Sequence, residues 1–144
     1  MISNVYVVFI GLTNDNNNSY CLSLSPKQLD LPVITIQHID HLHNEIRYYI
    51  KQSFDQSSFK FTEECDFNII SLQNELTIEY LKTKIENYDN QSNLVILCGG
   101  ILLKNKTKNT HHWHKLIYDA DHSGFTNNTN LNLLIDHVIN KTII

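Results

Sequence analysis

The order of apolar and polar positions divides this chain into strand-like and helix-like segments. Val5 to Leu12 is an almost unbroken apolar run rich in β-branched and aromatic residues, which predicts a strand buried on both faces and central in a sheet. The polar stretch Thr13 to Ser19 predicts a loop, and the alternation over Tyr20 to Leu24 predicts the returning strand of a hairpin. A third strand is predicted over Val33 to Gln37, after Pro32, because a strand start needs no donor there.

Three segments change to a helical period. The first has Asp40 available as its N-cap, the second carries Glu75 and Glu79 near its positive end, and the third starts near Thr129. In chain order, the apolar stripes of these predicted helices consist of Ile39, Leu42, Ile46, Tyr49, Ile50 and Phe54, then Ile78, Leu81, Ile85 and Tyr88, then Leu131, Leu134, Ile135, Val138 and Ile139.

One or two further strands are predicted over Phe59 to Phe61 and Phe67 to Leu72. The most apolar segment, Leu94 to Leu103, predicts a second core strand. Gly99-Gly100 inside it indicates a bulge, a bend or the close approach of another backbone.

The polar and basic stretch Lys104 to Thr110 then predicts a hairpin tip. His112 to Tyr118 is predicted as the hairpin partner of the preceding core strand, with Trp113 on one face of the pleat.

These segments predict an α+β fold in which a mixed, mainly antiparallel sheet packs with about three amphipathic helices. A chain of 144 residues is expected to form a single globular domain, residues 1–144. At this size, about two-thirds of the unfolded surface can be buried.

Composition indicates the kind of genome. Asparagine and isoleucine each occur eighteen times and arginine once, as Arg47, which points to AT-rich coding DNA. Such genomes belong to many phages and large viruses, some low-GC bacteria and a few protists.

Net charge and cysteine usage limit the classes of protein to which this chain can belong. A net charge of −4 argues against bulk nucleic-acid binding, because neutralising phosphates requires clustered Lys and Arg. Cys21, Cys65 and Cys98 are far apart and odd in number, which predicts reduced thiols. The start at Met1 has no basic region typical of a signal peptide, and Val5 to Leu12 is too short to span a bilayer. A non-secreted protein with no membrane association is expected.

Histidines are the candidate ligands for a transition metal. His38 and His41 could share a helix face, and His112 and His114 could share a strand face. Neither group has the spacing of a known zinc motif, so solvated or interface histidines are the favoured interpretation, and no cofactor is predicted.

Cys98, before two glycines, is the one candidate nucleophile, since glycines can expose an oxyanion site. Its position inside an apolar strand favours a buried structural thiol. The glycine pair lacks the partners of a P-loop or a dinucleotide fingerprint. No catalytic residues are therefore predicted, and a non-enzymatic protein is favoured.

The order of elements, with Leu31-Pro32 before a short segment, an amphipathic helix, a tryptophan-bearing strand and a C-terminal helix, resembles the layout of the Nudix family. That family holds magnesium with several carboxylates after a glycine-containing loop. Here Val33-Ile34 replaces the glycines, and in the segment Asn44 to Tyr49 only Glu45 could correspond. The resemblance therefore implies a fold related to Nudix proteins and a non-catalytic descendant.

The favoured hypothesis is a non-enzymatic structural or assembly component of a larger complex, an accessory capsid, neck or tail protein of a phage or virus. It would act in the virion after assembly in the host cytoplasm, or otherwise in the cytoplasm. Its partners would be other protein subunits, with a homo-oligomer among the options. The alternatives are a divalent-metal-dependent, Nudix-like nucleotide hydrolase and a small host-directed binding module. The interface candidates are Asn16, Asn17, Lys104, Lys106, Lys108, Ile143 and Ile144.

Overall fold

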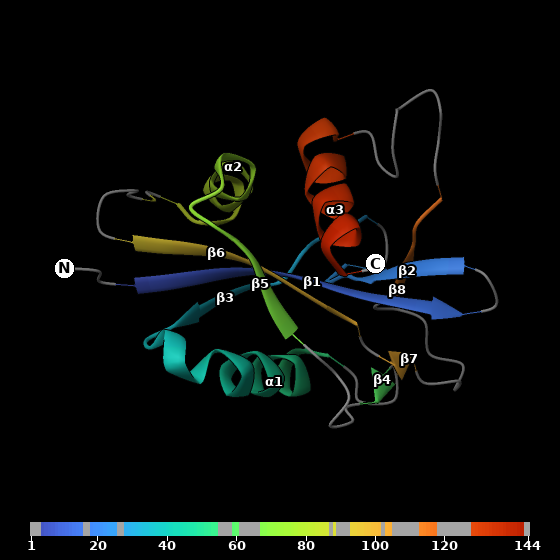
Figure 1. Ribbon diagram of the computed structural model, residues 1–144, viewed down its shortest axis with the longest axis horizontal. Coiled ribbons are helices and arrows are strands. Elements are labelled where there is room, and N and C mark those ends of the chain that lie inside the picture. Colours follow the sequence, from blue (N-terminus) through green and yellow to red (C-terminus); the bar gives the residue numbers. More distant parts are fainter. Residues whose placement is uncertain are drawn as a thin grey trace.

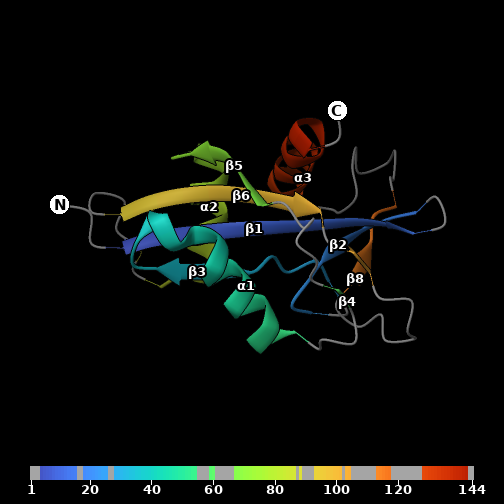
Figure 2. The same cartoon turned by 60° about the horizontal axis from the view of Figure 1, so that its bottom comes forward.

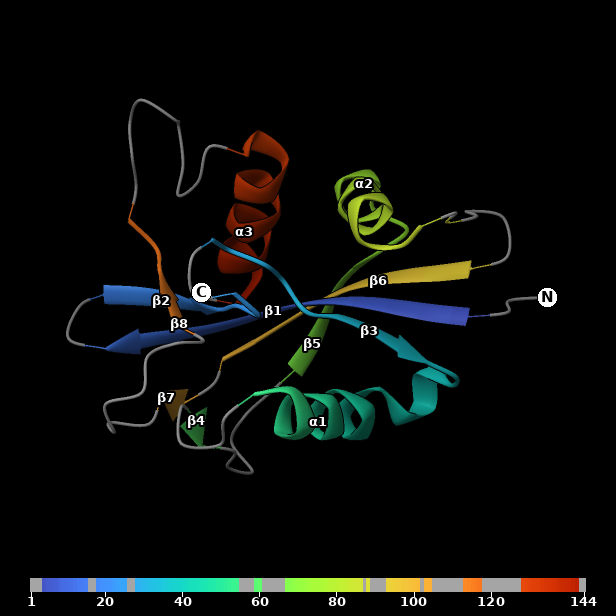
Figure 3. The same cartoon turned by 180° about the vertical axis from the view of Figure 1, so that it is seen from behind.

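A computed structural model describes residues 4–15, 18–25, 28–54, 59–60, 67–86, 88, 93–101, 103–104, 113–117 and 128–142. In these residues one mixed sheet lies between helix α1 on one face and helices α2 and α3 on the other (Figure 1). The view from behind shows the same three layers (Figure 3). The predicted α+β class, with a mainly antiparallel sheet and three helices, is confirmed.

Strand β1, Asn4–Asp15, is the centre of the sheet, as its apolar run predicts. One side of β1 pairs in parallel with β6, Asn93–Ile101. The other side pairs antiparallel with β3, Val33–Ile36, and then with β2, Asn18–Leu22. Alternate side chains of β1 enter two cores: Val5, Val7 and Phe9 pack with the residues under α1, and Val8, Ile10 and Leu12 pack with those under α2 and α3.

The hairpin between β1 and β2 reaches further than predicted. Its ladder runs from Leu12 opposite Cys21 to Asp15 opposite Asn18, so the predicted loop Thr13 to Ser19 is too long. Polar residues can continue a ladder where their side chains reach water. Here the Ser19 hydroxyl donates a hydrogen bond to the Asn14 side-chain oxygen at 2.8 Å.

The strand order is β5-β6-β1-β2-β8, with β3 beside β1. Strand β5, Phe67–Leu72, pairs antiparallel with β6, and β8, Trp113–Lys115, pairs antiparallel with β2. The predicted hairpin between Leu94–Leu103 and His112–Tyr118 is therefore wrong. Because β1 and β5 occupy both sides of β6, β8 adds to β2 instead. Trp113 is buried on one face of the pleat, as predicted.

Among the described residues, a second, two-stranded sheet has no ladder to the main one. It pairs β4, Phe59–Lys60, antiparallel with β7, Leu103–Lys104. Lys104 thus belongs to a strand and not to the predicted hairpin tip.

Helix α1, Leu42–Ser53, follows a 3₁₀ turn over Ile39–His41. Its predicted stripe is buried at Leu42, Ile46 and Ile50, whereas Ile39 is exposed. The prediction of Asp40 as N-cap is wrong. Asp40 lies inside the 3₁₀ turn, and His41 takes the N-cap position with no side-chain cap hydrogen bond.

Helix α2, Glu75–Lys84, begins at Asn74, whose side-chain oxygen accepts hydrogen bonds from the N–H groups of Leu76 and Thr77. The helix ends before the predicted Tyr88, because Ile85 already has extended backbone angles. Tyr88 instead packs edge-on against Tyr6 of β1, with ring centroids 5.7 Å apart.

Helix α3, Thr129–Thr142, confirms the third predicted helix. The Asn128 side chain accepts a hydrogen bond from the N–H of Leu131 at its start. Its apolar stripe packs on the same face of the sheet as α2, with Leu131, Leu134, Ile135 and Val138 buried and Ile139 partly buried.

Candidate functional site

Strand β5 lies at one end of the sheet order. Within the described ranges, β6 is the only strand that pairs with it, so the opposite edge of β5 carries no ladder. Figure 2 shows β5 beyond β6, on the far side of that strand from β1. A free edge presents main-chain N–H and C=O groups that another strand can pair with. We therefore treat this edge as the candidate functional site.

The sequence of β5, Phe-Asn-Ile-Ile-Ser-Leu, has no charged residue and no proline. Charged residues, proline and β-bulges are the common means by which natural edge strands limit pairing, and of these three β5 has only a bulge. A β-bulge between Ile69 and Ser71 shifts the alternation of its side chains. Ile69 lies opposite Cys98 and Leu72 lies opposite Ile96, and both of these β6 residues belong to the core under α1. Ile69 and Leu72 therefore share the α1 face.

Two of the three apolar side chains that β5 places on this face are open to solvent. Ile69 is 45% exposed and Leu72 is 53% exposed, in contrast to Phe67, which is buried at 1%. Ile70 points to the other face and packs against the core under α2 and α3. From Ile69 to Leu72, the outer edge of β5 therefore combines two exposed aliphatic residues with a backbone edge to which none of the described strands is paired.

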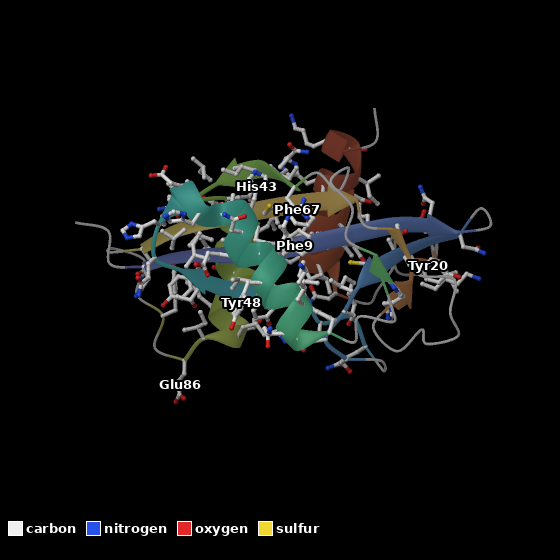
Figure 4. All side chains as sticks on the ribbon, turned by 90° about the horizontal axis from the view of Figure 1, so that it is seen from below. Phe9, Tyr20, His43, Tyr48, Phe67 and Glu86 are labelled. Carbon is white, nitrogen blue, oxygen red and sulfur yellow. The ribbon has the colours of Figure 1, made fainter. Side chains whose placement is uncertain are left out.

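Phe67 fixes the start of β5 to α1 and β1. Its ring packs edge-on against Phe9 with centroids 5.2 Å apart, and it stacks on His43 at 6.3 Å with an interplanar angle of 15°. The Arg47 guanidinium carbon lies 5.3 Å from the Phe67 ring centroid. Figure 4 shows His43, Phe67 and Phe9 together where α1 crosses the sheet. These contacts hold the start of the edge strand against α1 and β1.

Gln73 fixes the other end of β5. Its side-chain nitrogen donates to the carbonyl of Asn93 at 3.1 Å, and its side-chain oxygen accepts from the N–H of Val95 at 3.0 Å. Its own N–H donates to the carbonyl of Val95 at 2.9 Å. The side-chain amide thus extends the ladder to β6 past the last strand residue. The backbone of Gln73 has a φ of 51°, which turns the chain into α2.

The structure describes three of the four histidines that were considered as metal ligands. His38 and His41 are exposed at the start of α1, with ring centroids 6.2 Å apart, and His114 lies on β8, at the other end of the sheet (Figure 1). Burial lowers the pKa of His114. His112 lies outside the described residues. In the part of the chain that the structure describes, no group of three or more His, Cys, Asp or Glu side chains is placed to hold a metal ion.

The predicted identity of Cys98 as a buried thiol is confirmed. Cys98 is fully buried in β6, and burial raises its pKa from 9.0 to about 12, as it does for Cys21. Both of these thiols are free, and Cys65 lies outside the described residues. A reactive cysteine needs a stabilised thiolate, so the environment of Cys98 does not suit a nucleophile.

The predicted interface candidates Asn16, Asn17, Lys106, Lys108, Ile143 and Ile144 also lie outside the described residues, and Lys104 is described only as part of β7. Glu45, the one residue that could correspond to a Nudix carboxylate, is exposed on α1. Among the described helices, none has both the length and the apolar character needed to cross a bilayer.

A polar cluster on the α2 face has a structural role. The Tyr80 hydroxyl accepts a hydrogen bond from the N–H of Leu31 at 2.8 Å and lies 3.3 Å from a carboxylate oxygen of Asp30, which also pairs with Lys84. Burial is the largest cause of the raised pKa of Tyr80. The cluster attaches the segment before β3 to α2.

Comparisons with protein-family models, with curated proteins and with solved structures found no match. The resemblance to the Nudix layout therefore stays a prediction.

Sequence reasoning identified Phe67 to Leu72 as a strand but not as a site. The available signal was six consecutive residues without charge, preceded by the acidic residues Glu63, Glu64 and Asp66. Acidic residues beside an aggregation-prone strand are a known protective pattern. That this strand lies at the edge of the sheet follows only from the strand order, which the sequence does not show.

Proposed function

We propose that this protein is a non-enzymatic assembly component that binds other protein subunits through the outer edge of β5. The observation that carries the proposal is the exposed, uncharged edge strand with Ile69 and Leu72 on one face. Adding a strand to such an edge satisfies its backbone groups and buries its apolar side chains in one step.

We further propose that the assembly is a phage or viral particle, in which the chain serves as an accessory capsid, neck or tail protein. The support for this step is compositional, because the abundance of asparagine and isoleucine is typical of proteins from AT-rich genomes, which include those of many phages and large viruses. In a particle built of repeated subunits, an unprotected strand edge of a small domain can pair with a neighbouring subunit.

The test is sedimentation of the protein from its source. A lysate is fractionated on a density gradient, and this chain is detected in each fraction by mass spectrometry. The proposal predicts that the chain sediments with large particles. Recovery only as a free protein of 16.8 kDa would contradict it.

Two matched variants connect the result to β5. Ile69→Lys places a charge on the proposed edge, and Ile117→Lys places the same charge after β8, at the opposite edge, where Ile117 is 62% exposed. Substitutions at exposed sites usually change stability by less than about 0.5 kcal/mol, so both variants should fold. The Ile69→Lys variant should be absent from the particle fraction, whereas the Ile117→Lys variant should remain in it.

A further inference from the structure

We propose that the partner strand on β5 is β5 of a second copy of this chain, paired antiparallel about a two-fold axis normal to the sheet. This inference rests on the proposed function, since it names the subunit that the edge binds. The supporting observation is the side-chain pattern of β5, which allows the strand to pair with its own copy in a defined register.

The register follows from the faces. A two-fold axis normal to the sheet keeps each face on its own side, so directly opposed residues must come from the same face. Placing Ile69 opposite Leu72 of the second copy satisfies this condition, because both residues lie on the α1 face. The same register places Ile70 opposite Ser71 of the second copy. Ser71 lies opposite Leu97, which belongs to the core under α2 and α3, and Ile70 packs against that core.

The bulge makes this register possible. In a regular strand, residues 69 and 72 would point to opposite faces. The bulge between Ile69 and Ser71 brings Leu72 back to the face of Ile69. Each exposed aliphatic residue of one copy then meets an exposed aliphatic residue of the other, in two equivalent pairs across the axis.

Charge also favours a second copy at this edge over the other end of the sheet. A two-fold axis brings equivalent residues close together, so charges near it meet like charges. β5 contributes no charged residue, whereas β8 carries Lys115. Because each copy has a net charge of −4 and acidic residues precede β5 in the sequence, salt should strengthen the dimer by screening this repulsion.

The interface is small. A pair of six-residue strands with two aliphatic contacts falls at the low end of specific interfaces, below about 1,200 Å² of total buried surface. The isolated dimer should therefore be weak and concentration-dependent. Repetition in an assembly would raise its occupancy.

Sedimentation equilibrium of the purified full chain tests the inference, over roughly 10 to 500 µM, a range suited to weak dimers. A monomer–dimer equilibrium is expected that tightens with salt, weakens at least about tenfold in Ile69→Lys and stays unchanged in Ile117→Lys. A chain that remains monomeric throughout this range, or a dimer that Ile69→Lys leaves intact, would overturn the inference.

Cross-linking tests the register without relying on Ile69→Lys. In a Cys65→Ser background, the double variant Ile69→Cys with Leu72→Cys should form a disulfide-linked dimer on mild oxidation. The control pair Ile117→Cys with Leu133→Cys has similar exposure away from β5 and should stay monomeric. Equal cross-linking of both pairs would overturn the register.

The two proposals fail differently. The purified chain could stay monomeric while the Ile69→Lys variant is lost from the particle fraction. This result would contradict self-pairing and support the assembly role, with another protein bound to the edge. A purified dimer with the predicted register, found only in free fractions of the source lysate, would keep self-pairing and sink the assembly role.

Discussion

A Cβ atom placed on Gly99 of β6 would lie 2.5 Å from Cγ1 of Val138 on α3, and 3.3 Å from a side-chain carbon of Ile70. β6 runs in continuous register with β1 through both glycines, so the strand has no bulge against β1 at this point. Of the expectations for Gly99-Gly100, close approach is the one that the structure supports, although the approaching group is a side chain.

Gly99→Ala is therefore expected to destabilise the fold by about 1–3 kcal/mol, the usual cost of overpacking a core. Val138→Ala removes the methyl group that would clash. The double variant Gly99→Ala with Val138→Ala should be more stable than the sum of the two single effects predicts. Urea unfolding of all four proteins measures this coupling, and simple additivity would show that Val138 does not limit the space at Gly99.

Gln73 supplies the last rungs between β5 and β6. Gln73→Ala removes both side-chain hydrogen bonds and should cost about 1–3 kcal/mol. Gln73→Gly loses the same bonds but adopts a φ of 51° without strain, so it should be more stable than Gln73→Ala by up to about 1 kcal/mol. Thermal unfolding of the two variants checks the order. A less stable glycine variant would contradict this account of the turn.

Tyr80→Phe leaves the N–H of Leu31 without its side-chain acceptor inside the protein. Such a buried unpaired donor costs about 1–3 kcal/mol. Hydrogen exchange should show faster exchange at Leu31 in the variant. An unchanged rate at Leu31 would mean that the hydroxyl does not hold this segment on α2.

Alkaline pH should weaken the fold through its buried thiols. Burial raises the pKa of Cys21 and of Cys98 from 9.0 to about 12. Between these values the unfolded chain releases protons that the folded chain keeps. The stabilising effect is therefore complete below pH 9 and is lost as pH rises towards 12.

Each thiol should contribute a slope of about 1.4 kcal/mol per pH unit in this window. A variant with Cys21→Ala and Cys98→Ala will be less stable at neutral pH because it has two small cavities. Its loss of stability between pH 9 and 11 should nevertheless be shallower than that of the native chain. Equal slopes in urea titrations would contradict the burial of these thiols as the cause.

The sequence predicted those features of the fold that depend on local periodicity. The stripe through Leu42, Ile46 and Ile50 identified the buried face of α1, and the apolar run of β1 identified the central strand. Features set by competition between distant segments were not predictable in this way. β8 follows β6 in the chain, which suggested a hairpin, yet β6 has both sides occupied and β8 pairs with β2.

The candidate site depends on the same kind of information. Ile69 and Leu72 are three residues apart, and regular alternation would place them on opposite faces. Only the bulge in β5 and the position of β5 at the end of the strand order make them one exposed apolar surface. The cap of α1 shows a further limit, since Asp40 has a favourable side chain but lies inside a 3₁₀ turn that the apolar stripe does not reveal.

We propose the outer edge of β5 as the contact surface of this protein. Hydrogen–deuterium exchange tests it most directly by comparing the dilute purified chain with the chain in its isolated assembly. The segment Phe67 to Leu72 is expected to gain protection in the assembly, because its outward N–H groups become paired. Exchange in this segment that is the same in both samples, with protection gained elsewhere on the chain, would contradict the account.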